Sequence, residues 1–194
     1  YELNQEYSLA QYTWSELLSK ETDPVFKAKA YFSLANISYN EGMNNKNKPE
    51  SSFQEASKNY QLGFSLINPT LVQNQSLFSI AQISKNYVIS QYKINNRPKA
   101  ESLEKELSVY LNLEPDTKSE IKIHQAIYYL KLEPKKCEKI LSDLISEKNM
   151  SVKIVEEAYL WRGICNLQQN KNKEAIDDFL MISHSDNAQI RVQA

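Results

Sequence analysis

The chain contains very little glycine, and this absence narrows the choice of fold class. Only Gly42, Gly63 and Gly163 occur among its 194 residues. Ordinary proteins contain roughly 7% glycine, and tight β-turns depend on it. The low content therefore disfavours a turn-rich all-β fold. The six prolines are spread along the chain, and proline fits the first turn of a helix but breaks a helix interior. We interpret the prolines as helix starts.

The sequence also lacks a long apolar run and a strong net charge. Apolar residues make up 41% of the chain, but no run approaches the roughly 20 residues of a transmembrane helix. The formal net charge is −1, which is not typical of proteins that bind nucleic acid or membrane surfaces. We therefore expect no nucleic-acid binding and no membrane insertion.

The start of the chain carries no targeting signal. Tyr1 is followed by Glu-Leu-Asn, with no initiator Met and no apolar signal segment. We interpret the sequence as a piece of a longer protein, so its targeting cannot be read from it. The lack of a signal or transmembrane segment favours the cytoplasm without fixing the compartment.

Patterns that would indicate catalysis or metal binding are missing. The sequence has no Gly-rich phosphate loop, no Gly-x-Ser-x-Gly motif and no His-Glu-x-x-His motif. His124 and His184 are far apart, and no Cys/His cluster has zinc spacing. We expect no metal and no cofactor. In the pairs Glu156-Glu157 and Asp177-Asp178, neighbouring carboxylates point in two directions on a helix, and we expect solvated faces.

The two cysteines, Cys137 and Cys165, lie in apolar helical contexts. A buried free thiol is the ordinary interpretation of such a residue. A disulfide between neighbouring helices stays open, because spacing alone cannot exclude it.

One spacing recurs along the chain and indicates a helical repeat. In five segments a residue is followed by a second four positions later and a third three positions after that. Such steps place all three side chains on one helical face. The triplets are Ala10/Trp14/Leu17, Ala56/Tyr60/Gly63, Leu103/Leu107/Tyr110, Cys137/Leu141/Leu144 and Ala175/Phe179/Ile182.

Apolar periodicity, caps and prolines predict a succession of helices. The expected ranges are 2–20, 24–41, 50–67, 70–94, 98–113, 116–131, 134–148, 151–169 and 171–184. Asp23 before Pro24 is a cap followed by a helix start. Tyr110-Leu-Asn-Leu-Glu-Pro115 is repeated nineteen residues later as Tyr129-Leu-Lys-Leu-Glu-Pro134. The same helix exit used twice is direct internal repetition.

These helices group into a single array over 1–194. The predicted units are a half repeat at 1–23, helix pairs at 24–68, 69–114, 115–150 and 151–185, and the start of a further helix at 186–194. A single hairpin cannot cover its own apolar face, so stacking on neighbours builds the core. Half-units at both ends lead us to expect that the native chain continues on at least one side. An ordinary helical bundle is the alternative.

The strongest repeat resembles the tetratricopeptide (TPR) family. It reads Glu157-Ala-Tyr159-Leu-Trp-Arg-Gly163, followed by Ala175-Ile-Asp-Asp-Phe179. An aromatic residue, a small residue four positions later, and Ala and Phe four apart in the second helix are the packing residues of that family. Gly163 and Ala175 stand twelve apart, as in the family. The resemblance implies an all-α, right-handed α-solenoid of antiparallel helix pairs.

The other units match this pattern less well. Tyr31/Ala35 and Leu77/Ala81 look like first-helix signatures, but their units carry about ten extra residues relative to the 34-residue repeat. The segment Ala30-Tyr-Phe-Ser-Leu-Ala35 is also similar to Sel1-type repeats. The resemblance extends over nearly the whole chain.

In TPR arrays the first helices line a concave face that binds partner segments, and the resemblance implies which residues do so here. These are Lys29, Phe32, Asn36, Tyr39, Asn40, Gln75, Phe78, Gln82, Lys85 and Asn86. Amide side chains can pair with the N–H and C=O of a peptide backbone, and aromatic rings give flat apolar contact. The alternative is a polar face covered by water, with Phe32 and Phe78 partly packed. Phe32 stands where TPR proteins that bind chaperone termini carry a lysine, which argues against chaperone binding.

The equivalent face of the later units is apolar. Its members include Tyr129, Leu160, Ile164 and Leu167, and such a face is too apolar for free exposure. Either the following repeats cover it, or it receives a helix from a partner or from a second copy of the chain. Self-association is therefore open.

Together these patterns favour a non-catalytic scaffold that binds a protein or peptide partner. The alternative is a peptide-sensing regulatory module whose effector domain lies outside these residues. A helical-superhelix enzyme would need an acid/base pair converging across helices, for which the sequence gives no cue. An RNA-binding repeat would need a basic face, which a near-neutral chain does not suggest.

Overall fold

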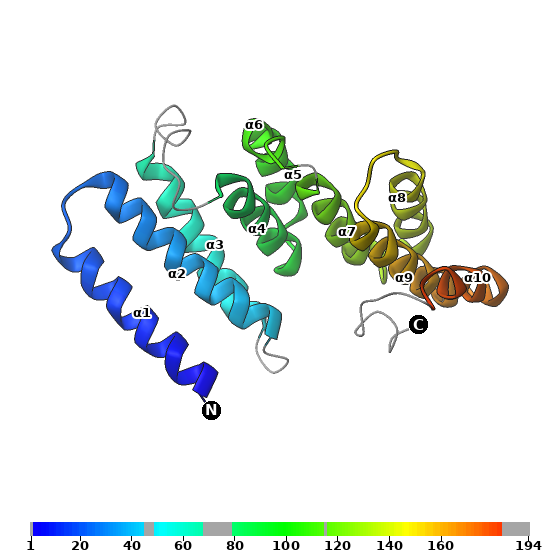
Figure 1. The fold of residues 1–194 in the computed structure, drawn as a ribbon, viewed down its shortest axis with the longest axis horizontal. Helices are drawn as coiled ribbons and strands as arrows, with labels where there is room; N and C mark the ends of the chain where they lie inside the picture. The colour runs from blue at the N-terminus through cyan, green and yellow to red at the C-terminus, as the bar shows by residue number, and fades with distance from the viewer. Residues whose placement is uncertain (1, 45–48, 68–78, 115, 184–194) are drawn as a thin grey trace. The chain divides into compact units, whose positions relative to one another are not determined.

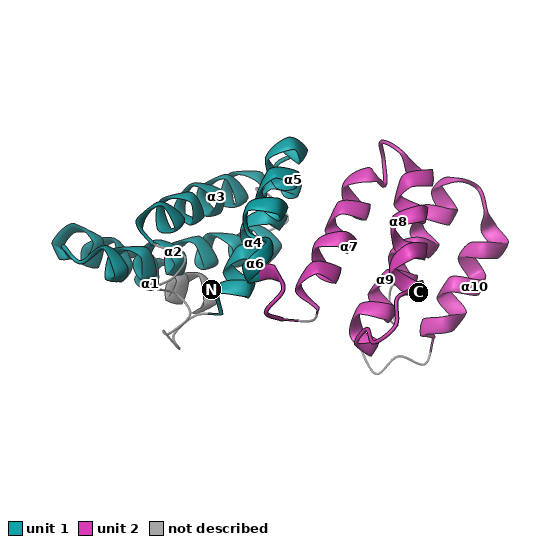
Figure 2. Ribbon diagram, turned by 90° about the horizontal axis from the view of Figure 1, so that it is seen from above, with its two compact units in different colours: residues 1–110 teal, residues 111–194 magenta. Residues whose placement is uncertain are grey.

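The computed structural model describes residues 2–44, 49–67, 79–114 and 116–183. These residues form ten helices and no strand (Figure 1), so the prediction of an all-α chain is confirmed for the part described. No helix in that part is both long and apolar enough to cross a lipid bilayer. The chain divides into two compact units, residues 1–110 and residues 111–194 (Figure 2). The single array over 1–194 stays a prediction.

Residues 1–110 (unit 1) contain long helices that pack against their neighbours in sequence (Figure 1). They are α1 (Glu2–Lys20), α2 (Pro24–Asn44), α3 (Pro49–Leu66), α4 (Ile80–Lys93) and α5 (Arg97–Glu106). The short α6 (Ser108–Leu111) follows at the boundary between the units. Residues 111–194 (unit 2) contain α7 (Thr117–Tyr129), α8 (Pro134–Ser146), α9 (Val152–Gln168) and α10 (Asn172–Ile182).

Helix starts follow the predicted caps and prolines. The Oδ1 atom of Asp23 accepts a hydrogen bond from the backbone N–H of Val25 at 2.7 Å, which caps α2. Ser79 and Ser151 cap α4 and α9 in the same way. Helices α2, α3 and α8 begin at a proline, and Pro98 lies in the first turn of α5. Pro69 and Pro115 lie outside the described residues.

Helix ends use asparagine in place of the scarce glycine. Asn95, Asn149 and Asn170 have φ values of 58°, 70° and 58°, in the left-handed region that asparagine tolerates better than most residues. They follow α4, α8 and α9 respectively. Asparagine thus lets the chain reverse direction although glycine is nearly absent.

Three predicted elements differ from the structure or lie partly or wholly outside the described residues. The helix expected at 98–113 is interrupted at Leu107, which ends α5 before α6 begins. Of the helix expected at 70–94, α4 is described, and residues 70–78 lie outside the described part. The helix start expected at 186–194 also lies outside it.

In unit 1, α2 and α3 pack more extensively than any other pair. Alanines are buried on both helices, among them Ala28, Ala35 and Ala56. At Gly63 the backbone of α3 lies against the Phe32 ring, and an added Cβ would lie 2.5 Å from Phe32 Cε1. Small residues therefore let the helices approach, and an aromatic ring fills the remaining space.

Unit 2 repeats this arrangement between α9 and α10. An added Cβ at Gly163 would lie 2.5 Å from Cε1 of Phe179, and Ala175 is fully buried. The main apolar cluster of the unit joins α7, α8 and α9 around residues such as Ile123, Leu141 and Ile154. The glycine contact thus fixes the last helix to this core.

Replacing Gly163 by leucine tests the close approach. We expect Gly163→Leu to lower the free energy of unfolding by roughly 1–3 kcal/mol, because the larger side chain must displace the Phe179 ring. Urea denaturation of the full chain measures the change. Gln168→Leu, at an exposed position on the same helix, serves as control and should change stability little. Equal stability of wild type and Gly163→Leu would refute the contact.

Candidate functional site

Two of the aromatic residues expected on the concave face are buried between helices. Phe32 is 5% exposed and Tyr39 is 8% exposed. Their rings make edge contacts with Phe64 at 5.1 Å and with Phe53 at 5.7 Å between centroids. Their placement on an open face is therefore wrong, because small residues on α3 leave room for both rings at the α2–α3 interface.

The remaining predicted residues differ in exposure. Lys29 is half-buried, with Nζ 4.9 Å from the centroid of the Phe26 ring, and Asn40 is exposed. Lys85 and Asn86 are buried, against the expectation of an open face, because α4 packs against α2, α3 and α5. Gln75 and Phe78 lie outside the described residues.

The structure does bring three predicted residues together, in what we term the amide cluster: Asn36, Gln82, Asn86 and the additional Tyr60. The Tyr60 hydroxyl donates to Asn36 Oδ1 at 2.6 Å. The Nδ2 group of Asn86 donates to the same oxygen at 3.4 Å, and Gln82 Nε2 donates to Asn86 Oδ1 at 3.1 Å. The cluster thus links α2, α3 and α4.

Aromatic rings support the cluster from within unit 1. Tyr60 lies 5.7 Å from the Tyr87 ring, which in turn stacks on Phe64 at 5.9 Å. Burial raises the pKa of Tyr60 well above its ordinary value and that of Tyr87 to about 12. Both hydroxyls therefore stay protonated at neutral pH, and Tyr60 remains a donor to Asn36.

Two hydrogen-bonding groups of the amide cluster are not used within it. Among the described residues, neither Asn36 Nδ2 nor Gln82 Oε1 has a hydrogen-bond partner, and both side chains are only half-buried. Asn36 Nδ2 can donate to the C=O of a peptide unit, and Gln82 Oε1 can accept from its N–H.

The sequence analysis did not include Tyr60 in the site, because its triplet, Ala56/Tyr60/Gly63, indicated helix packing alone.

The apolar residues predicted on the later face are mostly covered within unit 2. Tyr129 belongs to the main apolar cluster, and Leu160 packs with Ile182. Of the two alternatives for this face, cover by neighbouring helices is therefore the one observed at these two positions, where α8 and α10 supply the apolar contacts. Ile164 is half-buried against both clusters, while Leu167 remains 47% exposed.

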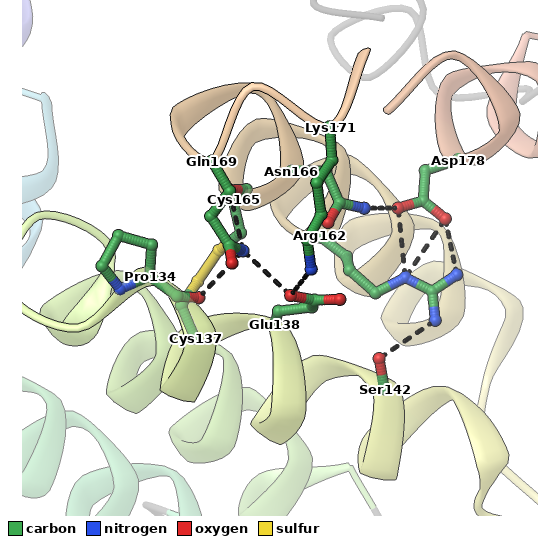
Figure 3. A network of polar contacts seen from close by, with 10 residues as sticks. All are labelled: Pro134, Cys137, Glu138, Ser142, Arg162, Cys165, Asn166, Gln169, Lys171 and Asp178. Carbon is green, nitrogen blue, oxygen red and sulfur yellow. Dashed lines mark hydrogen bonds and ion pairs between the residues drawn. A yellow bond between two sulfur atoms is a disulfide. The ribbon is translucent and has the colours of Figure 1, made fainter. Parts of the chain in front are cut away.

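A polar network joins α8, α9 and α10 in unit 2 (Figure 3). The Nε group of Arg162 donates to both carboxylate oxygens of Asp178 at 3.1 Å, and an Nη group donates to Oδ1 at 2.5 Å. Asn166 Nδ2 also donates to Asp178, and Ser142 accepts from Arg162. The hydrogen bond to Asp178 raises the pKa of Arg162.

The prediction of a solvated face is wrong for Asp178. Asp178 is only 4% exposed, whereas Asp177 is exposed. A buried carboxylate is tolerated only when it is paired and hydrogen-bonded, and Arg162 and Asn166 meet both conditions. No sequence signal distinguished the two aspartates, since the partners of Asp178 lie on another helix.

A second ion pair links the start of α8 to the α9–α10 turn. Lys171 Nζ donates to Glu138 Oε2 at 2.6 Å, and Gln169 Nε2 donates to the same oxygen at 2.9 Å (Figure 3). The bond from Lys171 lowers the pKa of Glu138. Because the folded-state pKa is lowered, this stabilisation is present above glutamate's ordinary pKa and is lost as pH falls through the lowered value.

Cys137 and Cys165 form a disulfide that joins α8 to α9 (Figure 3). The Cα atoms are 6.4 Å apart, within bridging range, because the two helices pack side by side. The interpretation as free thiols is therefore wrong, and the alternative left open by the sequence is the one observed. Disulfides persist in oxidising compartments and are rare in the cytosol, so this bond argues against the cytoplasm.

Comparisons with known proteins do not identify a family for this chain. The chain matches no protein-family model, no curated protein and no solved structure. In the described ranges, no three or more His, Cys, Asp and Glu side chains group so as to hold a metal ion. His124 is half-buried in α7, and His184 lies outside the described residues.

Removing the disulfide should destabilise the chain. We expect Cys137→Ser with Cys165→Ser to lower the free energy of unfolding by roughly 3–4 kcal/mol, because the bridge closes a loop over a sequence separation of 28. Urea denaturation measures the change, with and without a reductant. The reductant should destabilise only the wild type. Alkylation of both cysteines in unreduced, unfolded protein, detected by mass, would contradict the bond.

Breaking the Arg162–Asp178 pair tests its structural role. We expect Arg162→Met to lower the free energy of unfolding by about 2–3 kcal/mol, because a buried carboxylate loses its partner. The double variant Arg162→Met with Asp178→Leu should recover much of this loss, since no charge remains buried. Thermal and urea denaturation measure both. A double variant no more stable than the single one would contradict this account.

Proposed function

We propose that this chain is a non-catalytic, TPR-like helical-repeat scaffold that binds an extended segment of a partner protein at the amide cluster. One observation carries the proposal: Asn36 and Gln82, predicted from the sequence as contacts, meet through Asn86 and retain one unused donor and one unused acceptor. An extended peptide presents both complementary groups at every residue.

The packing within each unit supports the repeat part of the proposal. Successive helices in the sequence pack against each other, as stacked hairpins do in α-solenoids. The Phe179 ring lies against Gly163 and Ala175 is fully buried, which supports the resemblance to TPR packing. The tyrosines that open the two repeated segments, Tyr110 and Tyr129, are both buried.

Further side chains could extend the contact along α2. Lys29 and Asn40 lie at steps of seven and four residues from Asn36, on the same helical face. Asn40 is exposed and Lys29 is half-buried. An amide and a cation at these positions would contact the backbone and an acidic group of a bound segment. Phe32 and Tyr39 contribute by fixing α2 against α3.

A variant that lacks both unused groups tests the proposal. Asn36→Asp keeps the oxygen that accepts from Tyr60 and Asn86 but removes the Nδ2 donor. Gln82→Ala removes the acceptor together with the hydrogen bond that Gln82 donates to Asn86. A peptide selected from a random phage-displayed library on the full wild-type chain, labelled with fluorescein, serves as probe. We expect the double variant to bind it about tenfold or more weakly, since each peptide hydrogen bond contributes about 1 kcal/mol.

The control variant combines Gln54→Ala with Gln61→Ala, two exposed glutamines of α3. It should bind the probe as the wild type does. Circular dichroism should show that the double variant, the control and the wild type are all fully folded at the temperature of the binding measurement. Equal affinity of the folded double variant, or failure of the library to yield any binder, would contradict a peptide-binding site at the amide cluster.

A further inference from the structure

An open groove lies in unit 2 beside the start of α8 and the turn between α9 and α10. Its volume is about 890 Å³. Lys135, Lys136 and Lys139 come from α8, and Lys171 comes from the turn. Among the described residues that line it, the only carboxylate is that of Glu133. Lys171 is paired with Glu138, which leaves three lysines against one carboxylate in the lining. This lysine groove is therefore net cationic, although the whole chain has a net charge of −1.

Two lysines of the groove, Lys135 and Lys139, are not paired with a carboxylate of the described residues. Lys135 and Lys139 are exposed, and neither forms an ion pair within the described part of the chain. They stand four residues apart on α8, so both ammonium groups lie on one face and repel each other. An anionic group bound between them would relieve that repulsion.

The backbone adds to the positive potential of the lysine groove. Helix α8 begins at Pro134, has no acidic residue in its first turn, and receives no side-chain cap from Glu133. Among the described lining residues, the positive end of the helix dipole is therefore offset only by the carboxylate of Glu133. The helix dipole adds a smaller positive potential to that of the lysines, which supply most of the positive charge.

The walls of the lysine groove are held in place. Gln169 Nε2 donates to Pro134 O at 3.4 Å and to Glu138 Oε2 at 2.9 Å, which joins the turn to α8 (Figure 3). The disulfide fixes α8 to α9 next to these bonds. Lys136 Nζ lies 3.9 Å from the centroid of the Tyr129 ring, which orients a third cation. A ligand would meet a preformed site.

We propose that the lysine groove binds an acidic segment of a partner protein in which carboxylates alternate with apolar side chains. The cations would pair with the carboxylates. The Pro134 ring and the methylene stems of the lysines make the groove lining largely apolar and would contact the apolar side chains. RNA fits less well, since no aromatic ring on which a base could stack is among the described lining residues.

The test uses a fluorescein-labelled peptide of alternating glutamate and leucine, titrated with the full chain and followed by fluorescence anisotropy. Lys135→Glu with Lys139→Glu should weaken binding about tenfold or more, because two attractive contacts become repulsive. Lys148→Glu with Lys153→Glu changes the net charge equally at exposed positions outside the lining, and should bind almost as the wild type does. Lys135→Gln with Lys139→Gln should bind with intermediate affinity.

Several outcomes would overturn the proposal. One is the absence of peptide binding to the wild type, and another is an equal loss of affinity in both charge-reversed variants. Tighter binding of polyuridylate or of phosphatidylserine vesicles than of the peptide, at equal salt, would assign the groove to a different ligand. Asn36→Asp with Gln82→Ala should leave this peptide's affinity unchanged, so failure here is separate from failure at the amide cluster.

Discussion

Contact between a glycine backbone and an aromatic ring sets the helix spacing on which much of each unit depends. In unit 1 the Phe32 ring lies on Gly63, and in unit 2 the Phe179 ring lies on Gly163. The polar contacts follow from this spacing. Arg162 directly precedes Gly163 and Asp178 directly precedes Phe179 in the chain, so the contact that joins α9 to α10 also brings the buried ion pair together.

The two proposed sites would recognise a partner through different physical interactions. The amide cluster is uncharged, and its unused groups are suited to the backbone of an extended peptide, whatever its sequence. The lysine groove acts through charge, so salt should weaken its binding far more than binding at the amides. Each site belongs to one compact unit and is held by contacts within that unit.

Much of the helical succession could be predicted because its signals are local. A cap at Asp23, a proline at position 134 and an asparagine at position 95 act on the few residues around them. The prediction missed the interruption at Leu107, because the apolar period continues through it to Tyr110. Periodicity shows which residues share a face but does not show where a helix stops short.

The candidate site could be predicted only in part, because sequence signals are local and the site is formed by residues from different helices. The sequence by itself determined that the described chain is helical and that Gln82 and Asn86 share one face of their helix. Only the tertiary structure decided what the helix faces meet. It buried Phe32 and Tyr39 against α3, paired Asp178 with Arg162, and brought Cys137 to Cys165. Helical period is a property of neighbouring residues, whereas burial, pairing and cross-linking depend on which helices pack together.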